Sequence, residues 1–186
     1  MEPRLLLDSQ QLHITMQRLC CQILEQNLSL DDIIIIGLQP RGILFSDRIV
    51  AMLRMFQPNI HLDYGKLDIT FYRDDFRQSD KLHLPDATDI TFLIENKHVI
   101  IIDDVFYTGR SVRAALDALL DYGRPRKVEL MVLVNRKYHH HVPVQPDYIG
   151  ISVDTIVSQK VCVEWKVDDK TTDQVWILQE PKSAKE

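Results

Sequence analysis

The stretch VIIIDDVFYTGRS, from Val99 to Ser111, joins four β-branched apolar residues directly to two carboxylates and a glycine-containing turn. An uninterrupted apolar run is typical of a strand buried on both faces, as in a parallel sheet. Because buried charge is costly, Asp103 and Asp104 are expected at the carboxyl end of this strand, which is predicted over residues 99–102. Open α/β sheets bind their ligands at that edge, so the stretch predicts a ligand site there.

Helical and strand patterns alternate along the rest of the chain. The first and third predicted helices span residues 7–27 and 111–122, and the second runs from the end of a tight turn over residues 38–42 to about residue 56. The predicted strands span residues 33–37, 62–71, 99–102, 128–134, 147–151 and 160–165. This alternation predicts an α/β fold: a single domain over residues 1–186 with a doubly wound, mostly parallel sheet flanked by helices. The long polar stretch over residues 72–92 is typical of a lid loop, and the tail over residues 181–186 is expected to fray.

The composition is that of an ordinary globular protein. Apolar residues make up 45% of the 186 residues, and the net charge is −5, which argues against a general nucleic-acid binder. The longest apolar runs, such as Ile33 to Ile36, are too short to span a membrane, so no membrane contact is expected. The first eight residues lack the pattern of a signal peptide, and the three cysteines lack metal or redox spacing. We therefore expect a cytoplasmic protein.

The turn after the acid pair predicts a phosphate site. A strand–turn–helix unit points backbone N–H groups and the positive end of the helix at one spot, and Thr108 and Ser111 add hydroxyls there. Gly109 allows a close approach of the backbone. Two carboxylates would repel a bare phosphate, but they suit a ligand that also carries vicinal hydroxyls and a Mg²⁺ ion. A sugar with a 5-phosphate and free 2- and 3-hydroxyls meets this description.

This motif resembles the phosphoribosyl-diphosphate motif of type I phosphoribosyltransferases. The longer stretch DDVFYTGRSVRAALDALLDYGRP, residues 103–125, resembles one branch of that family. Members of this branch combine uracil phosphoribosyltransferase activity with regulation of pyrimidine-operon RNA. Three further blocks occur in the expected order: IIIIGLQPRGI at 33–43, LDITFYRDD at 67–75 and PDYIG at 146–150. They resemble the diphosphate loop, the strand entering the flexible loop and a late segment of the hood.

The resemblance assigns roles to the residues of the opening motif. Asp103 and Asp104 would hold the ribose hydroxyls, with Mg²⁺ bound next to them through phosphoribosyl diphosphate. The residues expected to surround the 5-phosphate are Val105, Phe106, Tyr107, Thr108, Gly109, Arg110 and Ser111. Catalysis is expected to depend on Asp103, Asp104, Arg41, Tyr72 and Arg73.

The resemblance also assigns the remaining parts of the site. Arg41 would bind the diphosphate together with the backbone of Gln39, Pro40 and Gly42. Tyr72 and Arg73 would begin the lid. The hood would be formed by residues 1–12 and about 147–180, and the base would lie beneath it near Val161 and Cys162.

The implied reaction transfers the ribose 5-phosphate group from phosphoribosyl diphosphate to uracil, giving UMP and diphosphate. The implied cofactor is Mg²⁺, and a homodimer or higher homo-oligomer is expected. Two alternatives remain open at this point. One is a regulator that senses UMP or UTP and binds RNA with little catalysis, and the other is a purine phosphoribosyltransferase.

The bond between Gln39 and Pro40 has two interpretations. Members of the family often hold a strained non-proline cis peptide in the diphosphate loop, and a proline at that place would lower the cost of the cis form. Alternatively, Pro40 is a trans proline that starts the next helix.

The stretch NRKYHHHVPVQPDYIGI, residues 135–151, departs from the branch. Histidines and Gln145 stand near positions where arginines are expected, and Ile151 replaces a lysine, although Arg136 and Lys137 remain. Because each lost cation weakens the binding of RNA phosphates, we expect weak or absent RNA attenuation. The three consecutive histidines, residues 139–141, cannot easily converge on one metal ion, so they predict an exposed loop.

Overall fold

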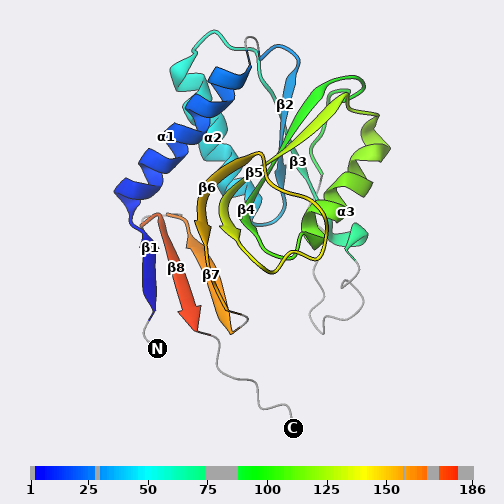
Figure 1. Ribbon diagram of the computed structural model, residues 1–186. Coiled ribbons are helices and arrows are strands. Elements are labelled where there is room, and N and C mark those ends of the chain that lie inside the picture. Colours follow the sequence, from blue (N-terminus) through cyan, green and yellow to red (C-terminus); the bar gives the residue numbers. More distant parts are fainter. Residues whose placement is uncertain (1–2, 28–29, 74–87, 157, 167–171, 180–186) are drawn as a thin grey trace.

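The computed structural model describes residues 3–27, 30–73, 88–156, 158–166 and 172–179 (Figure 1). Its main sheet has five strands in the order β3-β2-β4-β5-β6, and all four neighbouring pairs are parallel. The strands are β2 (Ile33–Leu38), β3 (Asp63–Leu67), β4 (His98–Phe106), β5 (Lys127–Arg136) and β6 (Tyr148–Val153). The predicted α/β fold with a mostly parallel sheet is confirmed.

Helices cover both faces of this sheet. Figure 1 shows α1 (Ser9–Gln26) and α2 (Gly42–Phe56) on one face and α3 (Arg110–Leu119) on the other. The apolar run of β2 explains this arrangement, because Ile35 packs in the core beneath α1 and α2 while Ile34 and Ile36 pack in the core beneath α3. All of these side chains are almost fully buried, so the sheet has no solvent-facing side at its centre.

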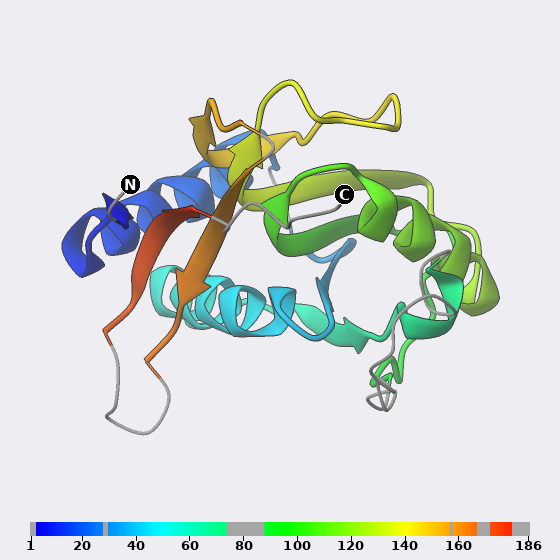
Figure 2. The same ribbon diagram turned by 90° about the horizontal axis from the view of Figure 1, so that it is seen from below.

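A smaller antiparallel sheet lies at one end of the molecule (Figures 1 and 2). Its strands run in the order β1-β8-β7, with β1 (Arg4–Leu7), β8 (Gln174–Gln179) and β7 (Gln159–Glu164). Its three strands fall within the ranges predicted for the hood, residues 1–12 and about 147–180. β6 pairs with β5 in the main sheet, and residues 9–12 belong to α1, which is capped by Asp8.

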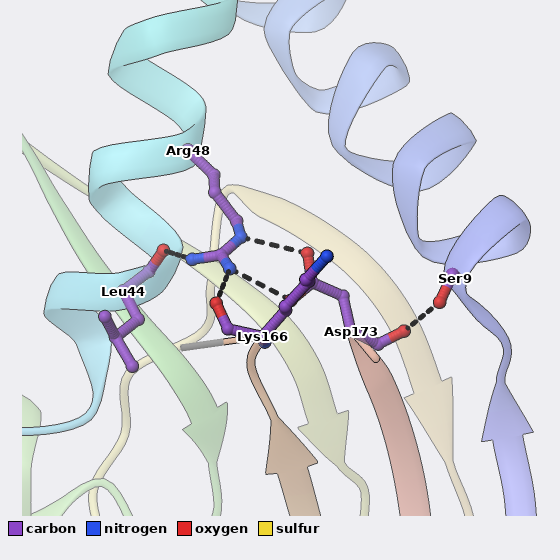
Figure 3. A network of polar contacts seen from close by, with 5 residues as sticks. All are labelled: Ser9, Leu44, Arg48, Lys166 and Asp173. Atoms are coloured by element: carbon purple, nitrogen blue, oxygen red, sulfur yellow. Dashed lines mark hydrogen bonds and ion pairs between the residues drawn. The ribbon is translucent and has the colours of Figure 1, made fainter. Parts of the chain in front are cut away.

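Arg48 of α2 forms hydrogen bonds with the residues that flank the small sheet (Figure 3). The Arg48 guanidinium donates two hydrogen bonds to the Asp173 carboxylate, at 3.1 and 2.9 Å, and one to the Lys166 carbonyl at 3.3 Å. It also lies 4.4 Å from the centre of the Trp165 ring. Ser9, at the start of α1, donates to the Asp173 carbonyl at 2.8 Å. These contacts join both helices of one face to the ends of β7 and β8.

The predicted strand over residues 62–71 ends early, at Leu67. The Asp68 carboxylate accepts hydrogen bonds from the backbone N–H and the hydroxyl of Thr70, at 2.7 and 2.6 Å. This local bonding turns the chain into a short 3₁₀ helix, Thr70–Tyr72, because it competes with the strand ladder. Most of the predicted lid, residues 74–87, lies outside the described residues. The chain that follows pairs with β3 through Lys66 and Asp89.

No helix in the described part of the chain combines the length and the hydropathy that a membrane-spanning segment needs.

Candidate active site

The acid pair lies in the part of β4 that pairs with β5 but extends past its pairing with β2. β2 pairs with β4 only as far as Gly37 and Ile102, whereas β5 stays paired with β4 as far as Phe106. Asp103 and Asp104 are therefore inside β4, and the prediction that the strand ends at residue 102 was wrong. Beside β2, however, the two acids lie beyond the last ladder pair. They thus occupy the carboxyl edge of the β2–β4 ladder while β5 still holds their backbone.

This edge is the topological switch point of the sheet. The chain passes from β2 outward to β3, returns to β4 beside β2, and then continues in the opposite direction to β5 and β6. In open α/β sheets, the loops that leave the two strands at such a point diverge and leave room for a ligand. Here those loops are residues 39–42 after β2 and residues 107–109 after β4.

The loop after β2 contacts the acid pair through Gly42. A Cβ atom on Gly42 would lie 2.6 Å from the Ile102 carbonyl oxygen and 3.1 Å from the Asp103 Cα, so only glycine fits. The Gln39–Pro40 peptide bond is cis, which confirms the first of the two interpretations. The Gln39 N–H donates to the Leu67 carbonyl at 2.9 Å, which fixes the loop to the end of β3.

Asp103 is half-buried and Asp104 is buried, and each interacts electrostatically with an arginine. Burial raises the pKa of Asp103 well above its ordinary value, the Asp104 charge raises it further, and Arg73 opposes the rise. Burial also raises the pKa of Asp104, and attraction to Arg41 opposes that rise. The Asp103 carboxylate accepts a hydrogen bond from the Asp104 N–H at 2.9 Å. The structure therefore brings four of the predicted catalytic residues into one electrostatic cluster: Arg41, Arg73, Asp103 and Asp104.

The loop after β4 leads into an open helix end. Gly109 has a φ of +84° and is the N-cap of α3, which begins at Arg110, one residue before the predicted start. Because glycine has no side chain to cap the helix, the N–H groups of the first turn remain for a ligand. The Thr108 hydroxyl accepts a hydrogen bond from the Arg110 N–H at 3.4 Å. This arrangement suits an anion, as the motif predicts.

Tyr72 points elsewhere. Its hydroxyl donates to the Asp121 carboxylate beyond the end of α3, and this hydrogen bond is the main reason that the pKa of Tyr72 rises to about 12. The structure thus separates the two residues predicted to begin the lid. Arg73 acts on the acid pair, whereas Tyr72 is bonded to the end of α3.

The predicted base site lies on the small sheet. The Val161 side chain is 4% exposed and packs in the hydrophobic core, so only its backbone is available to a base. Cys162 is half-buried. β7, which carries both residues, is an edge strand of the described three-stranded sheet. Its role in base recognition stays a prediction.

Two of the three histidines are hydrogen-bonded within the fold. His139 bonds to the Thr155 carbonyl at 2.8 Å and His140 to the Asn135 side chain at 3.2 Å. Only His141 is exposed, so the expectation of an exposed loop holds for one histidine of three. Among the described residues, no group of three or more histidine, cysteine, aspartate or glutamate side chains could hold a metal ion. Arg136, the last residue of β5, is 5% exposed and lies over the Tyr107 ring at 3.8 Å, a contact that the sequence does not predict.

Comparison with known proteins identifies the family. Residues 5–170 match the family model described as "Phosphoribosyl transferase domain". The chain belongs to the phosphoribosyltransferase family. The predicted fold and the predicted class of enzyme, a pentosyl-transferring glycosyltransferase, are confirmed.

Relatives in this family share most of the chain. The Bifunctional protein PyrR of Ligilactobacillus salivarius is 39% identical over 158 residues, covering 84% of this chain and 88% of the relative. The Bifunctional protein PyrR of Halalkalibacterium halodurans is 37% identical over 177 residues, covering 92% of this chain and 97% of the relative. The predicted resemblance to the bifunctional branch is confirmed.

Solved structures of phosphoribosyltransferases have the same fold. A hypoxanthine phosphoribosyltransferase from Trypanosoma cruzi has a TM-score of 0.72 at 16% identity, and the match covers 95% of each chain. One from Staphylococcus aureus has a TM-score of 0.65 at 16% identity, covering 85% of this chain and 80% of that chain. At this identity the likeness concerns the fold alone.

Proposed function

We propose that this chain transfers the ribose 5-phosphate group from phosphoribosyl diphosphate to a ring nitrogen of uracil, producing UMP and diphosphate. The observation that carries the proposal is the meeting, at one switch point, of a buried acid pair, an arginine loop and an open helix end. Identity of about 40% to bifunctional PyrR proteins over most of the chain supports the choice of branch.

The parts of the site match the parts of the substrate. The open start of α3, with Thr108 and Ser111, suits the 5-phosphate because its N–H groups have no helical partner. Asp103 and Asp104 suit the 2- and 3-hydroxyls, from which carboxylates accept hydrogen bonds. Arg41 and its loop lie beside the acids and suit the diphosphate.

The same arrangement suits the charges that develop during the reaction. As the bond from C1 of the ribose to diphosphate breaks, positive charge develops on the sugar and negative charge on the leaving group. The acid pair stabilises the former, while Arg41 and Arg73 stabilise the latter. Charged groups that the fold already holds in place need no reorganisation in the transition state, so they stabilise its charges more effectively than mobile groups would.

Magnesium fits this site as a partner of the substrate. The donor chemistry is suitable, because Mg²⁺ prefers carboxylate and phosphate oxygens. The described residues offer no group of three or more protein ligands, so the diphosphate would supply most of the coordination and Asp103 or Asp104 the nearest protein charge. When bound, Mg²⁺ would neutralise charge on the leaving diphosphate.

RNA regulation is the weaker part of the bifunctional reading. Arg136 is buried and bonded within the fold, and Lys137 lies 3.4 Å from the Asp154 carboxylate. Burial removes Arg136 as a cation for RNA phosphates, whereas the Lys137 side chain is exposed, and the loss of Arg136 supports the expectation of weak or absent attenuation.

The test is turnover of the purified chain with Mg²⁺, phosphoribosyl diphosphate and uracil, with hypoxanthine and guanine in parallel. The control is the double variant Asp103→Asn, Asp104→Asn. We expect UMP from the wild type and almost none from the variant. A purine nucleotide as the main product would keep the family chemistry and overturn the choice of base. No turnover with any base, together with tight UMP binding, would favour a nucleotide-sensing regulator.

A further inference from the structure

The segment Arg136–Val142 packs against the phosphate loop, Val105–Ser111. Two aromatic side chains of the loop make the first of these contacts. The Arg136 guanidinium lies 3.8 Å from the centre of the Tyr107 ring, and the His139 ring meets the same ring edge-on at 5.5 Å. The His140 ring lies 4.5 Å from the Phe106 ring. Phe106 and Tyr107 are thus contacted by three side chains of this segment.

The contacts continue along the next two residues of the phosphate loop. The Thr108 carbonyl accepts a hydrogen bond from the His141 N–H at 2.8 Å. At Gly109, a Cβ atom would lie 2.2 Å from a methyl group of Val142, so the Val142 side chain packs directly against the Gly109 backbone. Every residue from Phe106 to Gly109 therefore has a partner in the segment that contains the three histidines.

The same segment also contacts the loop after β6, residues 154–156. Arg136 Nε donates to the Thr155 hydroxyl at 2.8 Å, and Arg136 Nη2 donates to the Ile156 carbonyl at 3.4 Å. His139 Nε2 lies 2.8 Å from the Thr155 carbonyl, so this nitrogen must carry the proton and donate it. The loop after β6 leads directly into β7 of the small sheet.

We propose that Arg136 and His139 are positioning residues that couple the phosphate loop to the loop after β6. Each of them contacts Tyr107 on one side and Thr155 on the other. Binding of the ribose 5-phosphate then orders not only residues 105–111 but also residues 154–156, at the entrance to the small sheet. The coupling gives the base a prepared site once the sugar phosphate is bound. This role rests on the proposed function for its benefit, although the coupling itself does not require uracil as the base.

The side chains that join the two loops are buried. Arg136 is 5% exposed and Thr155 is 5% exposed, so neither side chain has water as an alternative partner. A buried polar group that loses its hydrogen-bond partner pays the full desolvation cost, which makes separation of the two loops unfavourable. Movement of Tyr107 on phosphate binding therefore carries Arg136, His139 and Thr155 with it.

The test is amide hydrogen exchange of the full chain with and without ribose 5-phosphate. In the wild type, we expect the ligand to protect amides in both residues 105–111 and residues 154–156. In His139→Ala, protection persists in the phosphate loop and is reduced in residues 154–156, where Arg136 remains as the second contact to Thr155. Equal protection of residues 154–156 in His139→Ala and the wild type would overturn the proposal, as would protection confined to the phosphate loop of the wild type.

Two variants separate coupling from simple loss of structure. His141→Ala removes a neighbouring, exposed histidine whose contact to Thr108 uses only its backbone, so it is expected to behave like the wild type. His139→Gln places an amide N–H where Nε2 stands, and it is expected to restore protection at residues 154–156. A His141→Ala variant in which this protection is reduced as in His139→Ala would contradict the specific role of His139.

Kinetics provide a second, separate readout. If uracil is the substrate, His139→Ala raises the KM for uracil, measured with saturating phosphoribosyl diphosphate, about three- to tenfold, the factor that one lost hydrogen bond is worth. Absence of uracil turnover in the wild type would contradict the proposed function alone, because exchange with ribose 5-phosphate still reports the coupling. A KM for uracil that is the same in His139→Ala and the wild type would contradict the coupling.

Discussion

At the scale of single residues, Asp103 is held in a state that favours function over stability. Its carboxyl is buried beside a second acid, and both effects raise its pKa well above the ordinary 3.8. The surrounding structure supplies arginines as partial compensation and leaves the remainder for a ligand with hydroxyls or a cation. Gly42 contributes to the same crowding, since no larger residue fits against Asp103. Such residues are expected at sites, because they violate the rules that stabilise a core.

The stability of the free protein is therefore expected to depend on pH through Asp103. Because the pKa of Asp103 is higher in the folded state than in the unfolded state, the folded state binds this proton more tightly. The free energy of unfolding therefore falls as the pH rises from 3.8 towards the folded pKa. Asp103→Asn removes this cost and is expected to melt higher than the wild type at neutral pH, while kcat/KM drops by about a hundredfold. Thermal melts between pH 3 and pH 8 measure the difference. A variant that melts lower than the wild type throughout this range would show that the buried carboxylate stabilises the fold.

At the scale of elements, local pattern determined what forms but not where each element ends. The alternation of apolar runs identified the strands of the main sheet, because both faces of these strands are buried. The end of β4 was misplaced because its extension past Asp103 depends on β5, which continues to Arg136 and holds its backbone. Likewise, β3 ends at a side chain–backbone contact of Asp68 that no hydrophobic pattern reveals.

The small sheet was the hardest element to predict. β1 has only four residues, and it pairs with β8, about 170 positions later in the chain. No local periodicity encodes such a pairing. The candidate site shows the same division: residues 103–111 form one contiguous motif, whereas the contact of Arg136 with Tyr107 has no local signal in the sequence. The role of Arg136 depends on Tyr107 and Thr155, which lie far from it in sequence.

The contact between α2 and the small sheet makes a prediction at this scale. The Arg48–Asp173 ion pair has two hydrogen bonds, and its side chains are 23% and 25% exposed. Asp173→Asn is expected to lower the free energy of unfolding by about 1–2 kcal/mol, because it weakens a charge-assisted, two-bond contact. Urea titration measures the change. The matched control is Asp32→Asn, which weakens a more exposed pair with Lys97 and is expected to cost clearly less. Equal costs for the two variants would remove any special role for the Arg48 contact.

At the scale of the whole molecule, the site is assembled from segments that only the fold brings together. The loop after β2, the acid pair of β4 and the start of α3 meet because β3 is added on one side of β2, whereas β4, β5 and β6 are added on the other. A ligand that spans these segments binds the folded state alone, so its binding free energy adds to the stability of the entire domain. Ligand binding is therefore readable as a shift in global unfolding.

This linkage distinguishes what holds Mg²⁺. At a concentration about 100 times Kd, either ligand is expected to stabilise the fold by about 2.7 kcal/mol. If the diphosphate supplies most of the coordination, chelation of Mg²⁺ should remove most of the melting shift caused by phosphoribosyl diphosphate and little of the shift caused by UMP, which has no diphosphate. The double variant Asp103→Asn, Asp104→Asn should lose much of both shifts, because both ligands carry the ribose hydroxyls. Thermal melts with and without a chelator measure all four cases. A UMP shift that disappears when Mg²⁺ is chelated would instead indicate that Asp103 and Asp104 hold the ion themselves, next to the ribose hydroxyls that both ligands carry.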